Sequence, residues 1–306
     1  MNRAEHIAVI GAGLMGTGIA QAFAVAGHDV SLFDPDGEAL ARVPRTIARN
    51  LQDLGAVPLD AQRLRLSTTL IDAVAAADIV FECGPERLAI KRQIFAELAK
   101  HTQPATILAS NTSVIPIGTI GADLSCAPRI LGTHWWNPAY LVPLVEVIPS
   151  ESTDDRHVRT TMELLARIGK SPVRLSRDIA GFVGNRLQFA LWREAQALVA
   201  DGVCDARTLD EIVKTGFGPR LAVLGPMENA DLIGLDLTLD IHRVVMPQLD
   251  RTPQPSALLE QLVAAGSLGF KTGTGFREWT PESMADCRRR LLLHLKKSFG
   301  GGSGSQ

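Results

Sequence analysis

Near its N-terminus the chain carries three glycines in the pattern Gly11-Ala-Gly13-Leu-Met-Gly16, between an apolar run that predicts a strand (HIAVI) and the start of a helical pattern. Asp34 ends the next apolar run, DVSLFD, at the distance that a strand–helix–strand unit requires. In such a unit the first glycine allows a tight turn, the second lets a ligand approach the backbone, and the third lets helix and strand pack closely. This combination predicts a dinucleotide site on an open α/β sheet.

The same segment indicates which dinucleotide binds. Leu14 and Met15 open the helix whose free N–H groups would face a pyrophosphate. Asp34 would accept hydrogen bonds from the hydroxyls of an adenosine ribose, and Asp36 follows it without a nearby arginine. A 2'-phosphate would meet like charge there, so NAD is favoured over NADP. A glycine turn without a ligand is the alternative, but strand, helix and acidic residue in register favour the ligand.

The order of elements predicts two domains. Short apolar runs alternate with amphipathic stretches through the first half, which is typical of a parallel, doubly wound sheet; the strand candidates are HIAVIG, DVSLFD, DIVFEC, ATILAS, RILGTH and PLVEVIP. Between Asp34 and Ser67 the apolar residues Leu40, Val43, Ile47, Leu51 and Leu54 have helical spacing and predict a helix. The run TTMELLARIGKSPVRL predicts one more helix and strand; strand patterns then stop, and GFVGNRLQFALWREAQALVADG opens a helical region. We expect a nucleotide-binding α/β domain at 1–178, a smaller all-helical domain at 179–298 and a flexible tail at 299–306.

Composition excludes several classes of function. The 306 residues are 46% hydrophobic and 21% charged, with a formal net charge of -2, so the chain has no overall field for nucleic acid or an anionic membrane. The apolar stretch 7–27 is interrupted by glycines, which predicts strand, turn and helix rather than a signal peptide or membrane span. Four scattered cysteines indicate neither a disulfide framework nor a metal site. We expect a cytoplasmic protein without a metal.

One histidine and one glutamate form a candidate catalytic pair. His134 ends the strand RILGTH, at the sheet edge where ligands collect in open α/β folds, and Glu146 lies within the apolar run PLVEVIP. A carboxylate in such a run needs a partner, because burying an unpaired charge is costly. If the two strands are neighbours, Glu146 could bond one imidazole nitrogen and leave the other to act as a general base. A purely structural histidine is the alternative.

Six ordered segments, spread over almost the whole chain, resemble the L-3-hydroxyacyl-CoA dehydrogenase family: IAVIGAGLMGTGIAQAFAVAGHDVSLFD, ASNTSVIPI, GTHWWNPAYLVPLVEVIP, DIAGFVGNRLQFALWREA, GPMENADLIGLD and GFKTGTGF. The resemblance implies a Rossmann domain, a helical C-terminal dimerisation domain and NAD-dependent interconversion of a 3-hydroxy and a 3-keto group, as in fatty acid metabolism. The apolar faces of the helical region exceed what one small domain needs, so we expect a homodimer.

The resemblance also implies roles for individual residues. His134 matches the family's general base, Glu146 its partner, Ser113 a residue that touches substrate and cofactor, and Asn185 one that holds the substrate carbonyl. The implied cofactor contacts are Glu86 and Lys91 near the nicotinamide ribose, Asn137 near the nicotinamide, and Lys271 from the second domain. Without the resemblance, Lys91 would be a solvated helix face, Ser113 a cap or turn, and Lys271 a loop charge.

Departures from the family pattern concern the substrate. The stretch EALARVPRTIARNLQDLGAV contains no lysine, and Asn50 and Val57 stand where relatives place a Ser and a Lys that meet the CoA phosphates. Its three arginines could bind phosphate or form a solvated face: Arg42, Arg45 and Arg49. Trp135-Trp136 replaces a Phe-Phe pair, and HWWNP resembles a branch whose substrate is not a thioester. The candidates are an acyl-CoA, a small free acid, aldehyde or imine, or a structural or regulatory role without catalysis.

Overall fold

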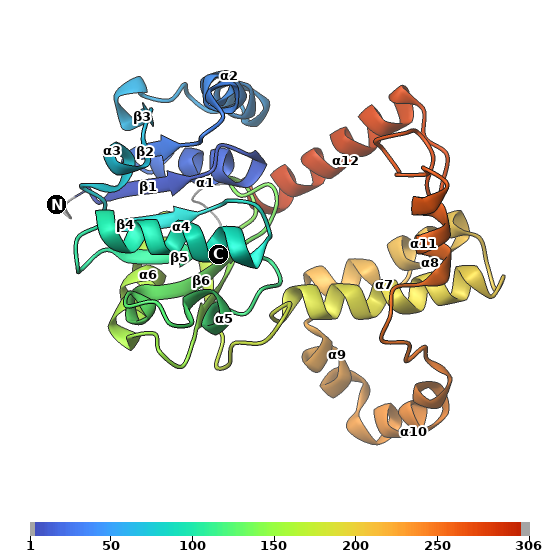
Figure 1. Cartoon of the computed structure of the whole chain (residues 1–306). Helices are drawn as coiled ribbons and strands as arrows, with labels where there is room; N and C mark the ends of the chain where they lie inside the picture. Colours follow the sequence, from blue (N-terminus) through green and yellow to red (C-terminus); the bar gives the residue numbers. More distant parts are fainter. Residues whose placement is uncertain (1–3, 301–306) are drawn as a thin grey trace. The chain divides into compact units, whose positions relative to one another are not determined.

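The computed structural model describes residues 4–300, so that the predicted tail lies almost wholly outside the described residues. The chain forms two compact units, one made of residues up to 185 together with those from 292 onward, and the other of residues 186–291. The predicted domain boundary after residue 178 stays a prediction. Figure 1 shows the order of the elements along the chain.

Within the described residues of the first unit, eight strands form one sheet in the order β3-β2-β1-β4-β5-β6-β7-β8. All neighbouring strands are parallel except β6 and β7, which are antiparallel. The predicted Rossmann-type α/β fold is thereby confirmed. The strands are β1 (His6–Ile10), β2 (Asp29–Phe33), β3 (Leu64–Ser67), β4 (Ile79–Glu82), β5 (Ile107–Ser110), β6 (Ile130–Trp135), β7 (Leu144–Pro149) and β8 (Ser171–Arg174).

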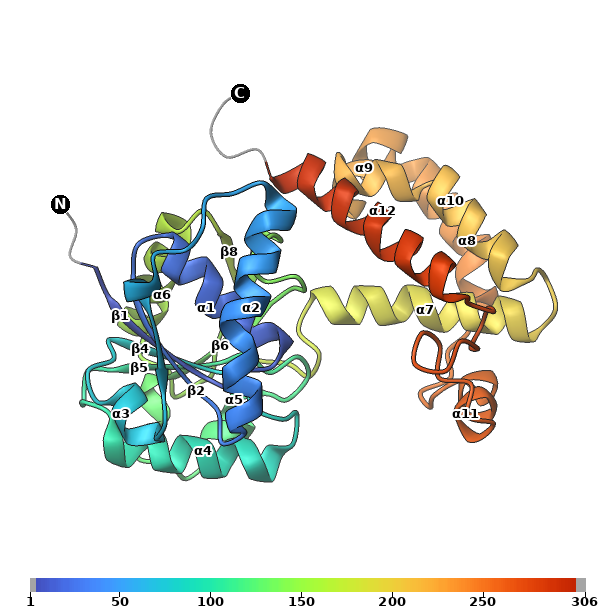
Figure 2. The ribbon, with the colours of Figure 1, turned by 90° about the horizontal axis from the view of Figure 1, so that it is seen from above.

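Helices cover both faces of the sheet (Figure 2). One face carries α1 (Leu14–Val25), α2 (Gly37–Leu54) and α6 (Asp155–Arg167), and the other carries α3 (Leu70–Val74), α4 (Leu88–His101) and α5 (Ile117–Gly121). The central strands β1, β4 and β5 are therefore buried on both sides, as parallel strands generally are. Phe23 of α1 and Phe81 of β4 are fully buried and lie 5.0 Å apart, ring centre to ring centre.

Helix α2 forms as its apolar spacing predicts. Leu40, Val43, Ile47 and Leu51 are buried, and each contributes roughly 1.5–3 kcal/mol through removal from water. Asp36 caps the start of the helix, where its carboxylate accepts a hydrogen bond from the N–H of Glu38, and Gly55, in the left-handed conformation, caps its end. Strand β3, which follows it, was not among the strand candidates because it is short and lies at the sheet edge.

The second unit is helical, as predicted: α7 (Gly184–Ala200) enters it, α12 (Pro281–Phe299) leaves it, and between them lie α8 (Ala206–Thr215), α9 (Pro226–Ile233), α10 (Leu235–Val245) and α11 (Ala257–Ala264). Large apolar side chains stay exposed along it, for example Val223 at 81%, Met227 at 74% and Leu232 at 71%. None of the helices described in residues 4–300 is long and apolar enough to cross a membrane. A single copy of this unit therefore leaves much apolar surface in water.

Candidate functional site

The glycine turn between β1 and α1 has the geometry that a bound dinucleotide needs. Gly11 has φ +109°, and a Cβ there would lie 2.7 Å from the carbonyl oxygen of Cys83. A Cβ at Gly16 would lie 1.8 Å from the carbonyl oxygen of Gly11. A Cβ at Gly13, by contrast, would have no atom within 4 Å. Gly11 and Gly16 are thus required by the fold itself, whereas the surface at Gly13 is open to a ligand.

Asp34 is held against this turn. Its Oδ2 accepts a hydrogen bond from the N–H of Ala12 at 2.7 Å, and its Oδ1 accepts one from the N–H of Asp36 at 2.8 Å. Helix α1 then starts at Leu14, which is 68% exposed, and no acidic residue occupies its first turn. Free N–H groups, an open backbone at Gly13 and a carboxylate at the end of β2 fit the pyrophosphate and ribose of NAD.

His134 and Glu146 meet across strands β6 and β7, where they lie directly opposite each other in the antiparallel register. The His134 Nδ1 and the Glu146 Oε2 are 2.7 Å apart, and both residues are buried. The Glu146 Oε1 accepts hydrogen bonds from the N–H groups of Val183 at 3.0 Å and Gly184 at 3.1 Å. The predicted neighbourhood of the two strands is present, and the bond to Glu146 is made by the Nδ1 of His134 and not by its Nε2.

The bonds to Glu146 also keep it ionised. Burial by itself would raise the pKa of this carboxyl, but the hydrogen bond to His134 and the N–H groups of Gly184 and Val183 outweigh burial and lower the pKa below its ordinary value. A carboxylate in this position accepts the proton on Nδ1 and so fixes the tautomer of the imidazole. The opposite nitrogen, Nε2, then carries the lone pair that a base needs.

Aromatic rings form the walls around His134. The ring centres of Trp136 and Phe182 lie 5.4 Å and 5.6 Å from the imidazole centre. Phe182 is fully buried and has φ +49°, in the left-handed region that a bulky residue rarely adopts. A Cβ at Gly184 would lie 2.4 Å from the Trp136 ring, so the first residue of α7 must be small. These contacts confine what can approach the imidazole.

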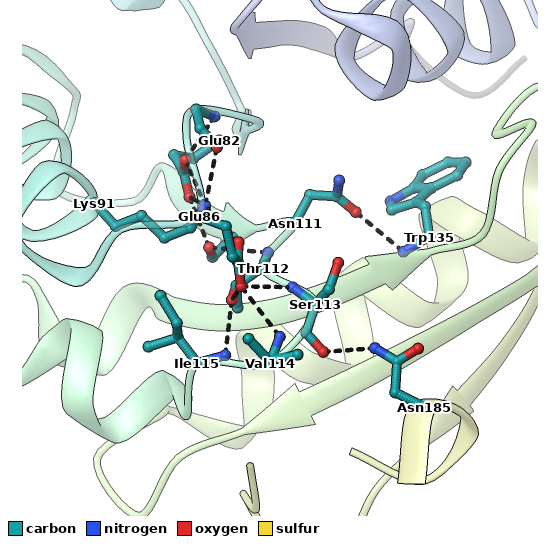
Figure 3. A network of polar contacts seen from close by, with 12 residues as sticks. Glu82, Glu86, Lys91, Asn111, Thr112, Ser113, Val114, Ile115, Trp135 and Asn185 are labelled. Atoms are coloured by element: carbon teal, nitrogen blue, oxygen red, sulfur yellow. Dashed lines mark hydrogen bonds and ion pairs between the residues drawn. The ribbon is translucent and has the colours of Figure 1, made fainter. Parts of the chain in front are cut away.

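Ser113 lies on the loop that follows β5, and Asn185 donates a hydrogen bond from Nδ2 to the Ser113 carbonyl oxygen at 2.8 Å (Figure 3). The Glu86 Oε1 accepts hydrogen bonds from the hydroxyl of Thr112 and from the N–H groups of Ser113 at 3.0 Å and Val114 at 3.1 Å. In the same loop, the Asn111 side chain accepts a hydrogen bond from the N–H of Trp135. The structure thus links Ser113, Asn185 and Glu86 in one network.

Lys91 belongs to the same network, and its side chain is buried in the interior of the first unit. It is 1% exposed, and its Nζ lies 2.9 Å from the Glu82 Oε1 and 3.6 Å from the Glu86 Oε2. Glu82 is not among the residues predicted from the sequence. Like Glu146 in β7, it is a glutamate in an apolar, buried strand, in this case the last residue of β4. The same argument, that a carboxylate in an apolar run needs a partner, would have found it.

Other predicted positions lie outside this network. Asn137 is exposed and precedes a cis peptide bond to Pro138, and Lys271 is exposed in the second unit. On α2, Arg42 pairs with Asp36 and Glu38, and Arg49 pairs with Asp53. The side chain of Asn50 is turned inward to Gln21, and Val57 is 83% exposed. The predicted roles of Asn137 and Lys271 stay predictions.

Comparison with known proteins gives two family matches. The model described as 3-hydroxyacyl-CoA dehydrogenase, NAD binding domain, matches residues 6–179, and the model described as 3-hydroxyacyl-CoA dehydrogenase, C-terminal domain, matches residues 181–279. Together they cover most of the chain.

Individual relatives differ in substrate. A 5-formyl-3-hydroxy-2-methylpyridine 4-carboxylate 5-dehydrogenase of Mesorhizobium japonicum is 36% identical over 305 residues, covering 97% of this chain and 99% of the relative. A probable 3-hydroxybutyryl-CoA dehydrogenase of Bacillus subtilis is 37% identical over 284 residues, covering 90% and 97%.

Solved structures show the same two kinds of relative. A structure of the pyridine-carboxylic acid 5-dehydrogenase, described as an NAD+ dependent dismutase, has a TM-score of 0.90 at 34% identity and covers 97% of this chain and 99% of its own. The (S)-3-hydroxybutyryl-CoA dehydrogenase of Ralstonia eutropha has a TM-score of 0.75 at 32% identity and covers 91% and 100%.

Proposed function

The chain belongs to the 3-hydroxyacyl-CoA dehydrogenase family and is an NAD-dependent dehydrogenase acting on a CH–OH group, and from that premise we propose that His134 is its general base. The observation that carries this proposal is the 2.7 Å bond between the His134 Nδ1 and the Glu146 Oε2, which leaves Nε2 as the basic nitrogen. Oxidation of an alcohol needs such a group, because the hydroxyl must lose its proton as hydride leaves the carbon.

In this mechanism NAD supplies the acceptor for the hydride when it is bound. His134 takes the hydroxyl proton on Nε2, and Glu146 stabilises the imidazolium that forms. Asn185, held by the Ser113 carbonyl, keeps a second amide hydrogen with which to bind the substrate oxygen. The Ser113 hydroxyl is the second neutral donor at that oxygen, so neither group competes for the proton.

For the substrate we propose a small free acid or hydrated aldehyde rather than a CoA thioester. A hydrated aldehyde presents the same CH–OH group as a secondary alcohol, and the relative with a TM-score of 0.90 is named for a formyl-bearing pyridine carboxylate. Arg42 and Arg49 of α2 are already paired with acidic residues of their own segment, and the Asn50 side chain bonds Gln21. Two of the three arginines of this stretch are thus paired within the chain, which favours a solvated helix face for them, whereas Arg45 makes no ion pair among the described residues.

A substrate panel read at NADH absorbance tests this choice. Acetoacetyl-CoA and its free acid, acetoacetate, are compared side by side as oxidants of NADH, together with an aromatic aldehyde carrying a carboxylate as a substrate for NAD. We expect saturable turnover with an unesterified compound and weak turnover with the thioester. Strong saturable activity on acetoacetyl-CoA would reject the free-acid proposal and favour a 3-hydroxyacyl-CoA dehydrogenase of fatty acid metabolism.

We further propose that two copies of the chain pair through the helical unit 186–291. A groove of about 800 Å³ in this unit is lined by aromatic rings, among them Trp192, Phe270, Phe276 and Trp279. The exposed apolar side chains of α9 and α10 add to the apolar surface of this unit, and such surface is typical of protein interfaces. A native mass measurement at micromolar concentration tests the pairing: a dimer is expected, and a monomeric mass contradicts it.

A further inference from the structure

We infer that Glu82 and Lys91 are positioning residues that act through Glu86 to fix the loop 111–114, and with it Ser113 and Asn185. The inference rests on the proposed function for its catalytic consequence, but its structural claim stands on the network in Figure 3. It adds to the cofactor contact predicted for Lys91 from the sequence, because the same ammonium group also pairs with Glu82 and lies close to Glu86.

The inner half of the network is a buried ion pair. Glu82 and Lys91 are 0% and 1% exposed, and the Lys91 Nζ lies 2.9 Å and 3.0 Å from the two carboxylate oxygens of Glu82. The Glu82 Oε1 also accepts the N–H of Gly84, and its Oε2 accepts the hydroxyl of Ser110. The carboxylate thereby holds the ends of β4 and β5 together. The ammonium group of Lys91 also lies close to a second carboxylate, that of Glu86.

The Oε2 of Glu86 lies 3.6 Å from the Lys91 Nζ, and its Oε1 accepts three hydrogen bonds from the loop. Partial burial would raise the pKa of Glu86, but the hydroxyl of Thr112, the charge of Lys91 and the N–H groups of Val114 and Ser113 together lower it. A carboxylate is therefore retained at the one point where three donors of the loop converge. Each of these bonds is charge-assisted and stronger than a neutral one.

The ends of the loop are also held by other bonds, since the Asn111 N–H donates to the Glu82 carbonyl oxygen, the Asn111 side chain accepts the Trp135 N–H, and the Val114 carbonyl oxygen accepts the Gly181 N–H. Among the described residues, Glu86 is the carboxylate that holds the middle of the loop. The amide of Thr112 bonds the Ser110 hydroxyl at 3.3 Å, and the amide of Ile115 bonds the Thr112 hydroxyl, so both depend on side chains that Glu82 or Glu86 holds. The Ser113 carbonyl then receives Asn185. Displacement of Glu86 would therefore move both groups proposed to bind the substrate oxygen.

Hydrogen exchange of the unliganded chain tests the positioning directly. The double variant Glu82→Gln/Lys91→Met replaces the ion pair by neutral side chains of similar volume, which avoids leaving one charge buried alone. Glu97→Gln/Lys100→Met is the matched control, because this pair joins the same residue types, and its lysine lies on the same helix α4, but it is exposed. We expect the amides of 112–115 to exchange at least about tenfold faster in the first double variant only.

Glu86→Ala is the second variant, and it keeps the test valid if the buried pair proves necessary for folding. It should show the same faster exchange, since it removes the acceptor of three loop donors. In both variants kcat on whichever of acetoacetyl-CoA and acetoacetate the wild type reduces should fall about tenfold to a hundredfold, the range seen when a reacting geometry is displaced. Because Glu86 and Lys91 are also the predicted cofactor contacts, kcat is read at saturating NADH and the affinity for NADH is measured separately.

The outcomes separate the two claims. Faster exchange at 112–115 in the folded Glu82→Gln/Lys91→Met variant supports the positioning role even if neither probe is turned over, so failure of the proposed function is recognised separately. Unchanged exchange in that folded variant overturns the inference, whatever Glu86→Ala shows. If the double variant does not fold, unchanged exchange in Glu86→Ala overturns it. If unchanged exchange is accompanied by weaker NADH binding in fluorescence titration, Lys91 and Glu86 act as direct cofactor contacts instead.

Discussion

Replacement of Glu146 by glutamine changes the hydrogen bonding of the proposed site while it keeps the shape of the side chain. The orientation of the new amide is set by Val183 and Gly184, whose N–H groups both point at the Oε1 position and need an acceptor there. The amide NH2 must then face the His134 Nδ1, at the position of the present 2.7 Å bond. Because an NH2 group can only donate, Nδ1 becomes an acceptor and the neutral imidazole carries its proton on Nε2.

This change removes the base from the reacting side. A neutral imidazole protonated on Nε2 cannot accept the hydroxyl proton, and the imidazolium loses its carboxylate. General-base catalysis is worth about 10²- to 10⁴-fold, and wrong-tautomer variants of comparable triads lose about 10⁴-fold. At about 1.36 kcal/mol for each tenfold, the expected rise in the barrier is about 3–5 kcal/mol.

The assay is kcat followed at NADH absorbance, with the NADH affinity measured by fluorescence titration. Glu151→Gln is the control, because Glu151 is an exposed glutamate just beyond β7 in the same unit. Acid unfolding gives a second readout. The folded pKa of Glu146 is lowered, so its contribution to stability is present above its ordinary pKa of 4.5 and is lost as the pH falls below that value.

Retention of more than about half of the wild-type kcat by Glu146→Gln would refute the role of the pair, since the loss of a working general base is worth far more than a factor of two. A parallel loss of stability by the variant and the wild type below their ordinary carboxyl pKa would also contradict it. The wild type should lose more, because glutamine does not titrate. A fall in NADH affinity as large as the fall in kcat would place the defect in cofactor binding.

Three further predictions concern the fold and the cofactor site. Gly13→Ala should fold normally but bind NADH at least about tenfold more weakly, because its Cβ enters the open surface that a pyrophosphate would occupy. Gly16→Ala should fail to fold or melt at a much lower temperature, because its Cβ would lie 1.8 Å from the Gly11 carbonyl oxygen. Normal NADH binding by Gly13→Ala in titration would refute pyrophosphate binding at this turn. Asp34→Asn should weaken NADH binding by about tenfold to a hundredfold, the worth of a hydrogen bond to a charged group, with little effect on NADPH, and equal losses for the two cofactors would contradict the ribose contact. Lys170 donates to the carbonyl oxygens of Ala139 and Val142, and burial lowers its pKa from 10.5 to about 8. The free energy of unfolding, measured relative to Lys170→Met, should therefore rise by about 3 kcal/mol as the pH rises from about 8 to 10.5, because in this range only the unfolded chain keeps the Lys170 proton. A flat or falling difference would contradict this prediction.

The fold could be predicted from the sequence largely because its signals are local. The glycines at 11, 13 and 16 and the apolar spacing of α2 each depend on neighbouring residues, and both predictions are confirmed. Strand β3 was not predicted because it has only four residues, is only partly buried and lies at the sheet edge. It forms by pairing with one parallel neighbour, β2. A pattern of four residues is too short to predict pairing with a strand that lies far away in the sequence.

The candidate site could be predicted only where a single residue broke a local rule. Glu146 stands out as a charge in an apolar run, and the structure places His134 opposite it. Lys91 shows no such signal, because a lysine in an amphipathic helix is usually solvated, and its burial depends on Glu82 of another element. Phe182 likewise has a positive φ, which a bulky residue rarely adopts and which its sequence neighbourhood does not predict.

The most direct test of the proposed general base is the turnover of His134→Gln at saturating substrate and cofactor, measured together with its NADH affinity. We predict that kcat falls by about 10²- to 10⁴-fold while the dissociation constant for NADH changes less than about threefold, since His134 lies on β6 and not at the glycine turn. Turnover equal to that of the wild type would contradict the assignment of His134 as the general base.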